Sequence, residues 1–300
     1  MTDRLQLHPQ VAAALAGNKP VVALESTVIA HGLPRPENLA TARRLEQIVR
    51  DAGATPATVA VLQGSLRVGL DDDQLELLAQ SGEVRKLSTR DLAIAAAVRA
   101  DGATTVAATM WIAHRAGIKV FATGGIGGVH RGSLPDVSAD LPELRRTPMI
   151  VVCSGPKIVL DLPATREWLE TNSVTVIGYE CDELPAFYSR GSGLPVDARC
   201  DTAAEVLAIY QAQKELGVNS ALLVTVPVPA AAEVEAEFLQ SVLAESLAQA
   251  QREQITGRDV TPFLLARMAE RSEGATLKAN IALLENNARV AAQIAGALSQ

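Results

Sequence analysis

Two kinds of hydrophobic pattern alternate along this chain. Short apolar runs rich in β-branched residues are followed by longer segments in which apolar residues recur every three to four positions. The first pattern is typical of strands buried on both faces, and the second is typical of helices that turn one face to a core. Their alternation predicts an α/β fold with three α/β/α layers, in which the central sheet is largely parallel or mixed. We expect strands at residues 21–24, 57–62, 119–122, 149–153, 174–178 and 221–226.

Helices are expected between these strands and throughout the C-terminal third of the chain. Residues 37–52 place apolar side chains on one face and precede Gly53, which suits a helix C-terminus. Ser88 and Asp91 have the spacing of a capping box before a helix over 92–100. Helical periodicity also covers residues 232–251, 262–270 and 276–299. These last helices are expected to cover the sheet or an interface between subunits.

The composition indicates a globular protein with a large core. Of the 300 residues, 48% are hydrophobic, which is enough to bury a sizeable interior. Because no internal repeat or low-complexity linker interrupts the chain, we expect one domain over residues 1–300. The formal net charge is −7, and the basic residues form no run that could follow a nucleic-acid backbone, so we expect no nucleic-acid polymer as a partner. A small phosphate remains a possible ligand, since a few backbone N–H groups and one or two cations suffice to bind it.

The cysteines and the apolar runs bear on where the protein works. Cys153, Cys181 and Cys200 are odd in number and form no Cys-x-x-Cys pair, which argues against a disulfide framework or a thiolate zinc site. The chain opens without a charged and then apolar leader, and Pro227 and Pro229 interrupt its longest apolar stretch. We therefore expect a cytoplasmic protein with no membrane contact.

Polar and glycine-rich segments follow several of the expected strands, where open α/β sheets place their ligand crevice. Glu25 directly follows the strand at 21–24 and is a candidate general acid or base, although a capping or surface glutamate is an equal alternative. The strand at 119–122 leads into the glycine-rich segment 124–128 and then His130. Such glycines can let backbone N–H groups converge on an anion, or they can form tight turns only.

Two aspartates with a hydroxyl between them come next in the chain. Asp136, Ser138 and Asp140 lie within five residues, and the pattern suits either metal binding or an ordinary solvated loop. The four histidines show no spacing typical of zinc ligands. Since the remaining ligands would be hard oxygens, a metal at this place is expected to be Mg²⁺ or Mn²⁺.

Lys157 is the candidate nucleophile. It follows the strand at 149–153 and comes directly after Pro156, which suits the first position of a helix. We therefore expect Lys157 in a first helical turn, where the helix dipole disfavours an ammonium and favours the free amine that attacks a sugar carbonyl. The alternative is a solvent-facing lysine at a helix start. Lys86 is expected to supply a second cation or to hold a phosphate, or else to be a plain surface residue.

The last expected helix carries amides in an otherwise apolar pattern. Asn280, Asn286 and Asn287 weaken helical propensity, so their presence needs a reason. Asn280 is expected to reach the site, with capping of a neighbouring element or contact with another subunit as the alternatives.

Taken together, these segments resemble the pseudouridine-5'-phosphate glycosidase family, also known from indigoidine synthase A-like proteins. The resemblance covers about nine-tenths of the chain and is far more specific than any single motif. It rests on residues 23–27, 29–32, 86–88, 90–92, 102–109, 121–132, 136–140, 153–157, 182–190 and 277–287.

The resemblance implies an activity and a role for each matching residue. The implied reaction is the reversible conversion of pseudouridine 5'-phosphate and water to uracil and ribose 5-phosphate, by a lyase of the carbon–oxygen hydro-lyase class that acts as a homotrimer. Glu25 would be the proton donor, Lys157 the nucleophile that forms an imine with ribose C1', and Asp136 the ligand of one Mn²⁺, or Mg²⁺, per subunit. The implied substrate contacts are Lys86, Val106, Ser138, Ala139 and Asp140, with Thr123, His130 and Asn280 as polar groups lining the site.

The chain departs from the family pattern in two places, and two other functions are alternatives to the one that the family implies. The segment between Gly132 and Asp136 is shorter than in the family, which could shift the metal ligand, and Pro156 stands where a small residue is common. Another lysine-dependent sugar-phosphate lyase or aldolase is one alternative, although the chain lacks a (β/α)8 rhythm. A non-catalytic nucleotide-phosphate binding protein is the other, but it would not need Glu25, Lys157 and Asp136 together.

Overall fold

A mixed sheet crosses the whole molecule in the computed structural model, which describes residues 4–131, 136–255 and 260–299. Its strands follow the order β1-β4-β3-β2-β7-β9-β13-β11-β12, and β6 and β5 branch from β3. A separate ribbon pairs β8 with β10. The strands are β1 (Leu5–Leu7), β2 (Val21–Leu24), β3 (Thr55–Leu62), β4 (Ser65–Val68), β5 (Arg85–Leu87), β6 (Gly102–Thr104), β7 (Val120–Ala122), β8 (Val129–His130), β9 (Ile150–Cys153), β10 (Leu160–Asp161), β11 (Thr175–Tyr179), β12 (Ala198–Cys200) and β13 (Leu222–Thr225).

The pairing confirms the expected largely parallel or mixed sheet. From β3 to β12 every neighbouring pair along the path is parallel, whereas β4 and β6 both run antiparallel to β3. The six expected strands are β2, β3, β7, β9, β11 and β13, and each observed boundary falls within two residues of the expected one. The strands that the pattern did not identify are mostly short edge or connecting strands, and a run of two to four residues carries little periodicity.

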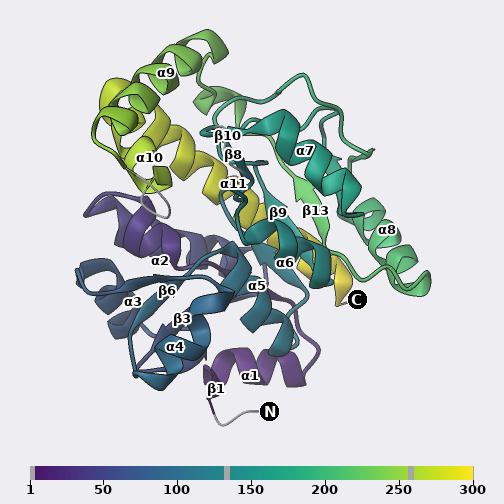
Figure 1. The fold of residues 1–300 in the computed structure, drawn as a ribbon. Helices are drawn as coiled ribbons and strands as arrows, with labels where there is room; N and C mark the ends of the chain where they lie inside the picture. Colours follow the sequence, from purple (N-terminus) through teal and green to yellow (C-terminus); the bar gives the residue numbers. More distant parts are fainter. Residues whose placement is uncertain (1–3, 132–135, 256–259, 300) are drawn as a thin grey trace.

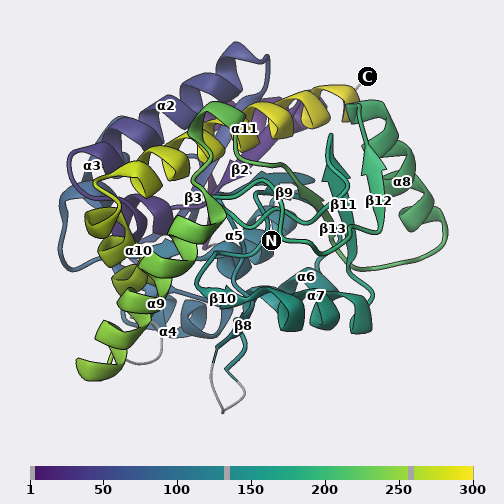
Figure 2. The ribbon, with the colours of Figure 1, turned by 90° about the horizontal axis from the view of Figure 1, so that it is seen from above.

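Helices cover both faces of the sheet and confirm the three layers (Figures 1 and 2). Helices α2, α8 and α11 pack on one face, and α1, α5, α6 and α7 pack on the other. The helices are α1 (Pro9–Ala16), α2 (Glu37–Asp51), α3 (Asp72–Gln80), α4 (Leu92–Ala97), α5 (Val106–Arg115), α6 (Asp140–Arg146), α7 (Leu162–Thr171), α8 (Ala203–Glu215), α9 (Ala236–Arg252), α10 (Val260–Arg271) and α11 (Ala275–Leu298).

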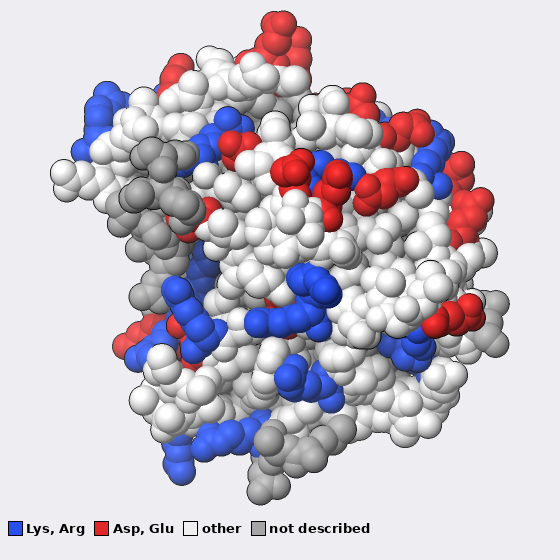
Figure 3. Space-filling model, turned by 45° about the vertical axis from the view of Figure 1, so that its right-hand side comes forward, with Lys and Arg blue, Asp and Glu red and all other residues white. Residues whose placement is uncertain are grey.

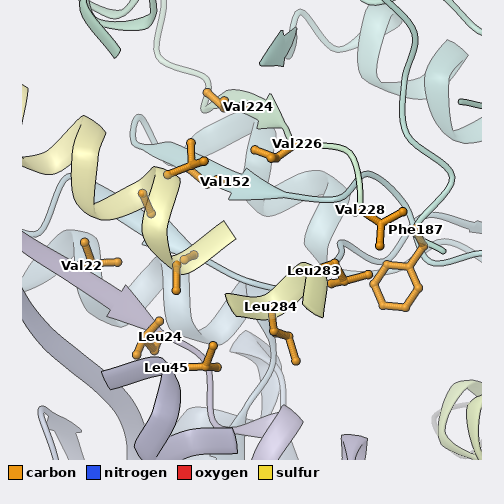
Figure 4. Close-up of a cluster of buried hydrophobic side chains, with 14 of the residues drawn as sticks. Val22, Leu24, Leu45, Val152, Phe187, Val224, Val226, Val228, Leu283 and Leu284 are labelled. Atoms are coloured by element: carbon orange, nitrogen blue, oxygen red, sulfur yellow. The ribbon is translucent and has the colours of Figure 1, made fainter. Parts of the chain in front are cut away.

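The central strands read as continuous apolar runs because each of their two sets of side chains meets a helical layer. In β2, Val22 and Leu24 face the layer of α2 and α11, and Val21 and Ala23 face the layer of α1 and α5. All four are buried, as expected where alternate side chains point to opposite faces. Figure 4 shows Val22 and Leu24 in the same cluster of buried side chains as Leu284 of α11.

The C-terminal third is helical, as the periodicity predicts. The expected helices at 232–251, 262–270 and 276–299 are α9, α10 and α11. The first of these starts at Ala236 because a short helical turn, Ala230–Ala232, stands before it. Helix α11 lies along the sheet, while α9 and α10 pack on each other at one end of the molecule (Figure 1). None of the helices in the described ranges has the length and apolar character needed to span a membrane.

Charged side chains are spread unevenly over the surface. On the face drawn in Figure 3, acidic groups lie mainly along the upper and right-hand parts. The basic groups of the lower half are separated from one another by uncharged surface (Figure 3). This face therefore presents isolated cations rather than one continuous basic surface.

Candidate active site

Three neighbouring strands end in polar residues at the same edge of the sheet. Glu25 directly follows β2, Thr123 follows β7 and Ser154 follows β9, and β7 pairs with both of the other strands. The ladder continues past the strand ends, since the Thr123 N–H donates to Val152 O at 3.0 Å and the Ser154 N–H to Gly124 O at 2.8 Å. Because parallel strands share the direction of their carboxyl ends, residues far apart in sequence meet here.

Glu25 is held rigidly at this edge. Its neighbour Ser26 donates a hydrogen bond to Val59 O at 2.6 Å and accepts one from the Thr104 N–H at 2.9 Å, so the end of β2 is tied to β3 and β6. A π-helical turn over Val28–Gly32 follows, a rare conformation that is frequent at functional sites. These contacts anchor the backbone that follows Glu25, and the Thr123 hydroxyl donates a hydrogen bond to the Glu25 carboxylate itself.

The surroundings of Glu25 suit a group that exchanges protons. Only 9% of the residue is exposed, and this burial raises the pKa of Glu25 above its ordinary value of 4.5. The nearby charge of Lys157 and a hydrogen bond donated by Thr123 act in the opposite direction and lower the pKa, as does Lys86 to a smaller extent. Asp140 adds to the rise. A carboxyl with a raised pKa can hold its proton nearer to neutral pH, as a general acid requires.

Lys157 faces Glu25 from the end of β9, but the prediction that it sits in a first helical turn is wrong. Pro156 forms a parallel bridge with Ile126, and the Lys157 N–H donates to Ile126 O at 3.1 Å. The chain after β9 therefore pairs with the glycine-rich segment, and helix α7 begins only at Leu162, capped by Asp161. The helix-dipole argument for Lys157 does not apply, because the residue lies outside any helix and precedes a single turn, in which the Leu160 N–H donates to Lys157 O at 3.0 Å.

A cavity of about 420 Å³ opens at this edge of the sheet. All the residues expected at the site line it except Thr123, which lies just behind Glu25 and contacts it through the hydroxyl. The lining residues among them are Glu25, Lys86, Val106, His130, Asp136, Ser138, Ala139, Asp140, Lys157 and Asn280. The fold thus brings together residues that are spread over most of the chain.

Further residues line the cavity that sequence reasoning did not assign to the site. His31, Ser88 and Arg90 stand inside the segments that carry the family resemblance, so their position in those segments was an available signal. The Asp91 carboxylate accepts the Ser88 N–H at 2.9 Å, as the expected cap requires. Thr261, Pro262 and Leu265 of α10 also reach the cavity, as does Leu284 of α11. The apolar residues among them give no signal in the sequence, because they look like any core-facing helix positions.

Asp140 is a structural bridge within the site. It is buried, and its Oδ1 accepts the Ala107 N–H at 2.9 Å while its Oδ2 accepts the Gly127 N–H at 2.8 Å. The carboxylate thereby joins the first turn of α5 to the glycine-rich segment. Ser138 adds a second tie, since its N–H donates to Gly128 O at 3.0 Å.

The glycine-rich segment serves close packing more than the expected anion binding. The Gly127 N–H is taken by Asp140, and the Ile126 N–H donates to Gly155 O at 3.1 Å. A Cβ atom at Gly127 would overlap the Ser138 hydroxyl, and one at Gly128 would overlap the Thr165 hydroxyl. The prediction that the amides of 124–128 converge on a ligand is therefore wrong for Ile126 and Gly127, because tertiary contacts already use them.

The residues available to hold a metal are few. Asp136 is exposed at the cavity wall, and its backbone carbonyl accepts the His130 N–H at 2.8 Å. Within the described ranges no cluster of three or more His, Cys, Asp or Glu side chains exists. An exposed carboxylate beside an open cavity fits a hard cation that keeps most of its waters, as Mg²⁺ and related ions do. The short segment before Asp136, residues 133–135, lies outside the described residues.

The fold and this cavity define an α/β protein with a buried carboxyl and a lysine at the carboxyl ends of parallel strands. The family described as indigoidine synthase A like protein matches residues 10–297 of the chain. The chain belongs to this family, and the resemblance noted from its motifs is confirmed.

Curated relatives match the chain over its full length. A pseudouridine-5'-phosphate glycosidase of Geobacillus kaustophilus is 50% identical and covers 100% of this chain and 100% of its own. The protein of the same name from Herpetosiphon aurantiacus is 52% identical and covers 99% of each.

Solved structures share the fold. The prealnumycin C-glycosynthase AlnA in complex with ribulose 5-phosphate is 41% identical, with a TM-score of 0.91, and the match covers 100% of this chain and 98% of that one. An indigoidine synthase A-like protein of Thermotoga maritima is 38% identical, with a TM-score of 0.91, over 99% and 97% of the two chains.

Proposed function

We propose that this protein is a pseudouridine-5'-phosphate glycosidase, which reversibly converts pseudouridine 5'-phosphate and water to uracil and ribose 5-phosphate. The observation that carries the proposal is the placement of Glu25 and Lys157 in one cavity, close enough for the lysine charge to lower the pKa of the carboxyl. Full-length relatives of that name, about half identical in sequence, support the choice of substrate.

The chemistry must break a C–C bond between ribose and base. A base that is joined through carbon is not released by protonation of a ring nitrogen, so the sugar ring has to open first. In our proposal the Lys157 amine attacks C1', the bond from C1' to the ring oxygen breaks, and Glu25 gives its proton to that oxygen. The product is an open-chain sugar joined to Lys157 and still carrying the base.

The base then leaves from this adduct. The proton that the Lys157 nitrogen loses returns to Glu25, and Glu25 passes it to C5 of uracil as the C1'–C5 bond breaks. The nitrogen lone pair forms the C1'=N bond of an imine with Lys157. Water adds to this imine and releases ribose 5-phosphate, which restores the free lysine and the protonated glutamate.

The polar wall of the cavity is proposed to hold the phosphate. Lys86 on β5 and the Ser138 hydroxyl both line the cavity, and Arg90 lines it on the same segment as Lys86. A phosphate prefers such a combination of cations and hydroxyl or backbone donors. Val106, Ala139, His130 and Asn280 would contact the sugar and base from the remaining walls.

A divalent metal, Mn²⁺ or Mg²⁺, is part of the proposal. Asp136 would hold it through its carboxylate with waters as the other ligands, and the ion would supply positive charge that orients bound water near the substrate. Asp136→Asn and chelator treatment are both expected to lower activity, and added Mn²⁺ should restore activity only in the chelated parent.

A homotrimeric assembly and a cytoplasmic location also belong to the proposal. Light scattering coupled to gel filtration measures the mass of the assembly directly. A mass of three chains supports the proposal, and a monomer contradicts that part of it.

A second function is favoured by one comparison. The solved C-glycosynthase relative is in complex with ribulose 5-phosphate, which favours C-glycosidic chemistry on a different acceptor. In that case the same Glu25 and Lys157 pair would act on ribose 5-phosphate with another carbon acid in place of uracil.

The deciding experiment follows free uracil by chromatography after incubation with pseudouridine 5'-phosphate and manganese. Borohydride reduction in the presence of ribose 5-phosphate, with mass spectrometry of peptides, tests whether Lys157 forms the imine. Uracil release that a chelator stops, with the adduct on Lys157, supports the proposed function. An adduct without uracil release points to another acceptor. If a folded protein gives neither uracil release nor an adduct, the proposal of an enzyme is contradicted, and a binding protein is the remaining reading.

A further inference from the structure

A buried amide on α11 contacts the ends of β7 and β9, two strands that border the catalytic pair. Asn287 is 0% exposed and sits in a row of apolar α11 residues that includes Leu283, Leu284 and Ala288. Figure 4 shows Leu283 and Leu284 of this helix over the strands of the sheet. An amide in such a place destabilises the fold unless all its polar atoms are hydrogen-bonded.

The hydrogen bonds of Asn287 are directed at β7 and β9. Its Nδ2 donates to Thr123 O at 2.9 Å and, at a longer 3.4 Å, to Gly124 O. The Ser154 hydroxyl lies 3.1 Å from Nδ2 and 3.3 Å from Oδ1, so the two side chains are also paired. One side chain thus joins the first residues after two neighbouring strands.

Each of these contacts leads directly to a reacting residue. Thr123, whose carbonyl Asn287 binds, donates its hydroxyl to Glu25. Ser154 begins the segment that turns at Gly155, with a φ of 78°, and reaches Lys157 three residues later. Only glycine fits this turn, because a Cβ at residue 155 would overlap Pro185 O. Asn287 is therefore connected to Glu25 through Thr123 and to the Lys157 segment through Ser154.

We propose that Asn287 is a positioning residue, which sets the separation of Glu25 and Lys157 by joining Thr123 to Ser154. The inference rests on the proposed function in so far as Glu25 and Lys157 are the reacting groups. A displacement of about 1 Å between reacting groups can lower a rate by about 100-fold while binding changes little. Asn287 is thus expected to act on kcat more than on KM.

The main test is Asn287→Leu, which keeps the size of the side chain and removes its hydrogen bonds. We expect kcat to fall by about 100-fold with KM within about threefold of the parent, in protein that is folded by circular dichroism. Asn286→Ala is the matched control. Asn286 is half-buried, and among the contacts described its side chain accepts a hydrogen bond only from Arg289. The kinetics of this variant should equal those of the parent. A folded Asn287→Leu protein with parental kcat overturns the inference.

Hydrogen exchange supplies a readout that needs no substrate. The amides of Ser154 and Lys157 donate to Gly124 and Ile126, so they should exchange faster in Asn287→Leu than in the parent, with no change in Asn286→Ala. If the parent releases no uracil, the proposed function fails while this exchange still decides the positioning role. Unchanged exchange at these amides contradicts it.

A second variant covers the case in which Asn287→Leu does not fold. Ser154→Ala removes only the hydroxyl that pairs with Asn287, and we expect kcat to fall by about tenfold with faster exchange at Lys157. Parental kcat and exchange in Ser154→Ala overturn the inference. Where both single variants fold, the double variant should lose less than the product of the two effects, because both changes break one contact.

Discussion

The Thr123 hydroxyl donates a hydrogen bond to Oε1 of Glu25, and the two residues are the first to follow the neighbouring strands β7 and β2. They are 98 positions apart in the chain, so the bond exists only because the two strands pair in parallel. It gives the buried carboxyl a donor that partly offsets the effect of burial on its pKa.

Lys157→Arg should abolish turnover while keeping a cation in place. A guanidinium stays protonated and cannot form an imine, so we expect kcat to fall on the order of 1,000-fold or more and the borohydride adduct with ribose 5-phosphate to disappear. Lys119→Arg is the control, because Lys119 is exposed at the start of β7, at the other end of the strand from the site. Near-parental rates in folded Lys157→Arg would rule out the imine.

Glu25→Gln should abolish activity and raise stability at higher pH. Because burial raises the pKa of Glu25 above 4.5, the folded protein binds this proton more tightly than the unfolded chain does. The resulting stabilisation is fully present below about pH 4.5 and is lost as the pH rises through the raised pKa of the folded state.

A neutral amide of the same shape avoids this loss. We expect the Tm of Glu25→Gln to exceed that of the parent by about 2 °C near pH 8, with the gap closing towards about pH 5. Scanning calorimetry across this range measures it. A Tm difference that does not change with pH, or a less stable variant at high pH, would show that burial does not determine the pKa of Glu25.

Thr123→Val removes the hydroxyl and keeps the shape of the side chain. Since the Thr123 hydrogen bond lowers the pKa of Glu25, its loss should raise that pKa further. The alkaline limb of the kcat/KM profile is then expected to move to higher pH, with a maximal rate about tenfold lower. Thr123→Ser retains a hydroxyl and should keep the limb in place. An unshifted limb in Thr123→Val would mean that another group controls it.

Gly127→Ala tests the packing of the glycine-rich segment. The added methyl group would overlap the Ser138 hydroxyl and crowd Asp140, so one of these residues must move. We expect a loss of about 1–3 kcal/mol in stability and a higher KM, measured by urea unfolding and steady-state kinetics. Gly82→Ala, where a Cβ meets nothing within 4 Å, is the control and should change neither quantity. A parental KM in Gly127→Ala would show that the packing of the glycine-rich segment does not affect substrate binding.

The strands and helices could be predicted well because local pattern decides them. The apolar runs at β2, β7, β9 and β13 are buried on both faces, and the amphipathic segment of α2 has one apolar face, so their types follow from periodicity. The short strand β6 and the ribbon of β8 with β10 could not be read in the same way, since their partners lie elsewhere in the chain.

The surroundings of Lys157 show where local reasoning fails. Pro156 suits a helix start, yet the chain there pairs with Ile126, because a backbone bridge to a neighbouring segment is available in the folded protein. For the same reason the Gly127 N–H, which was expected to face an anion, donates to the Asp140 carboxylate instead. Propensity at single residues is weak compared with such tertiary contacts.

The sequence by itself determined the alternation of strands and helices, the family to which the chain belongs, and the placement of Glu25 and Lys157 just beyond strand ends. Only the tertiary structure decided which groups meet: the hydroxyl of Thr123 on Glu25, the carboxylate of Asp140 on two backbone amides, and the amide of Asn287 between two strands. The reason is that periodicity records which side of an element is buried, whereas a hydrogen bond between distant residues depends on strand order and register, which no local pattern contains.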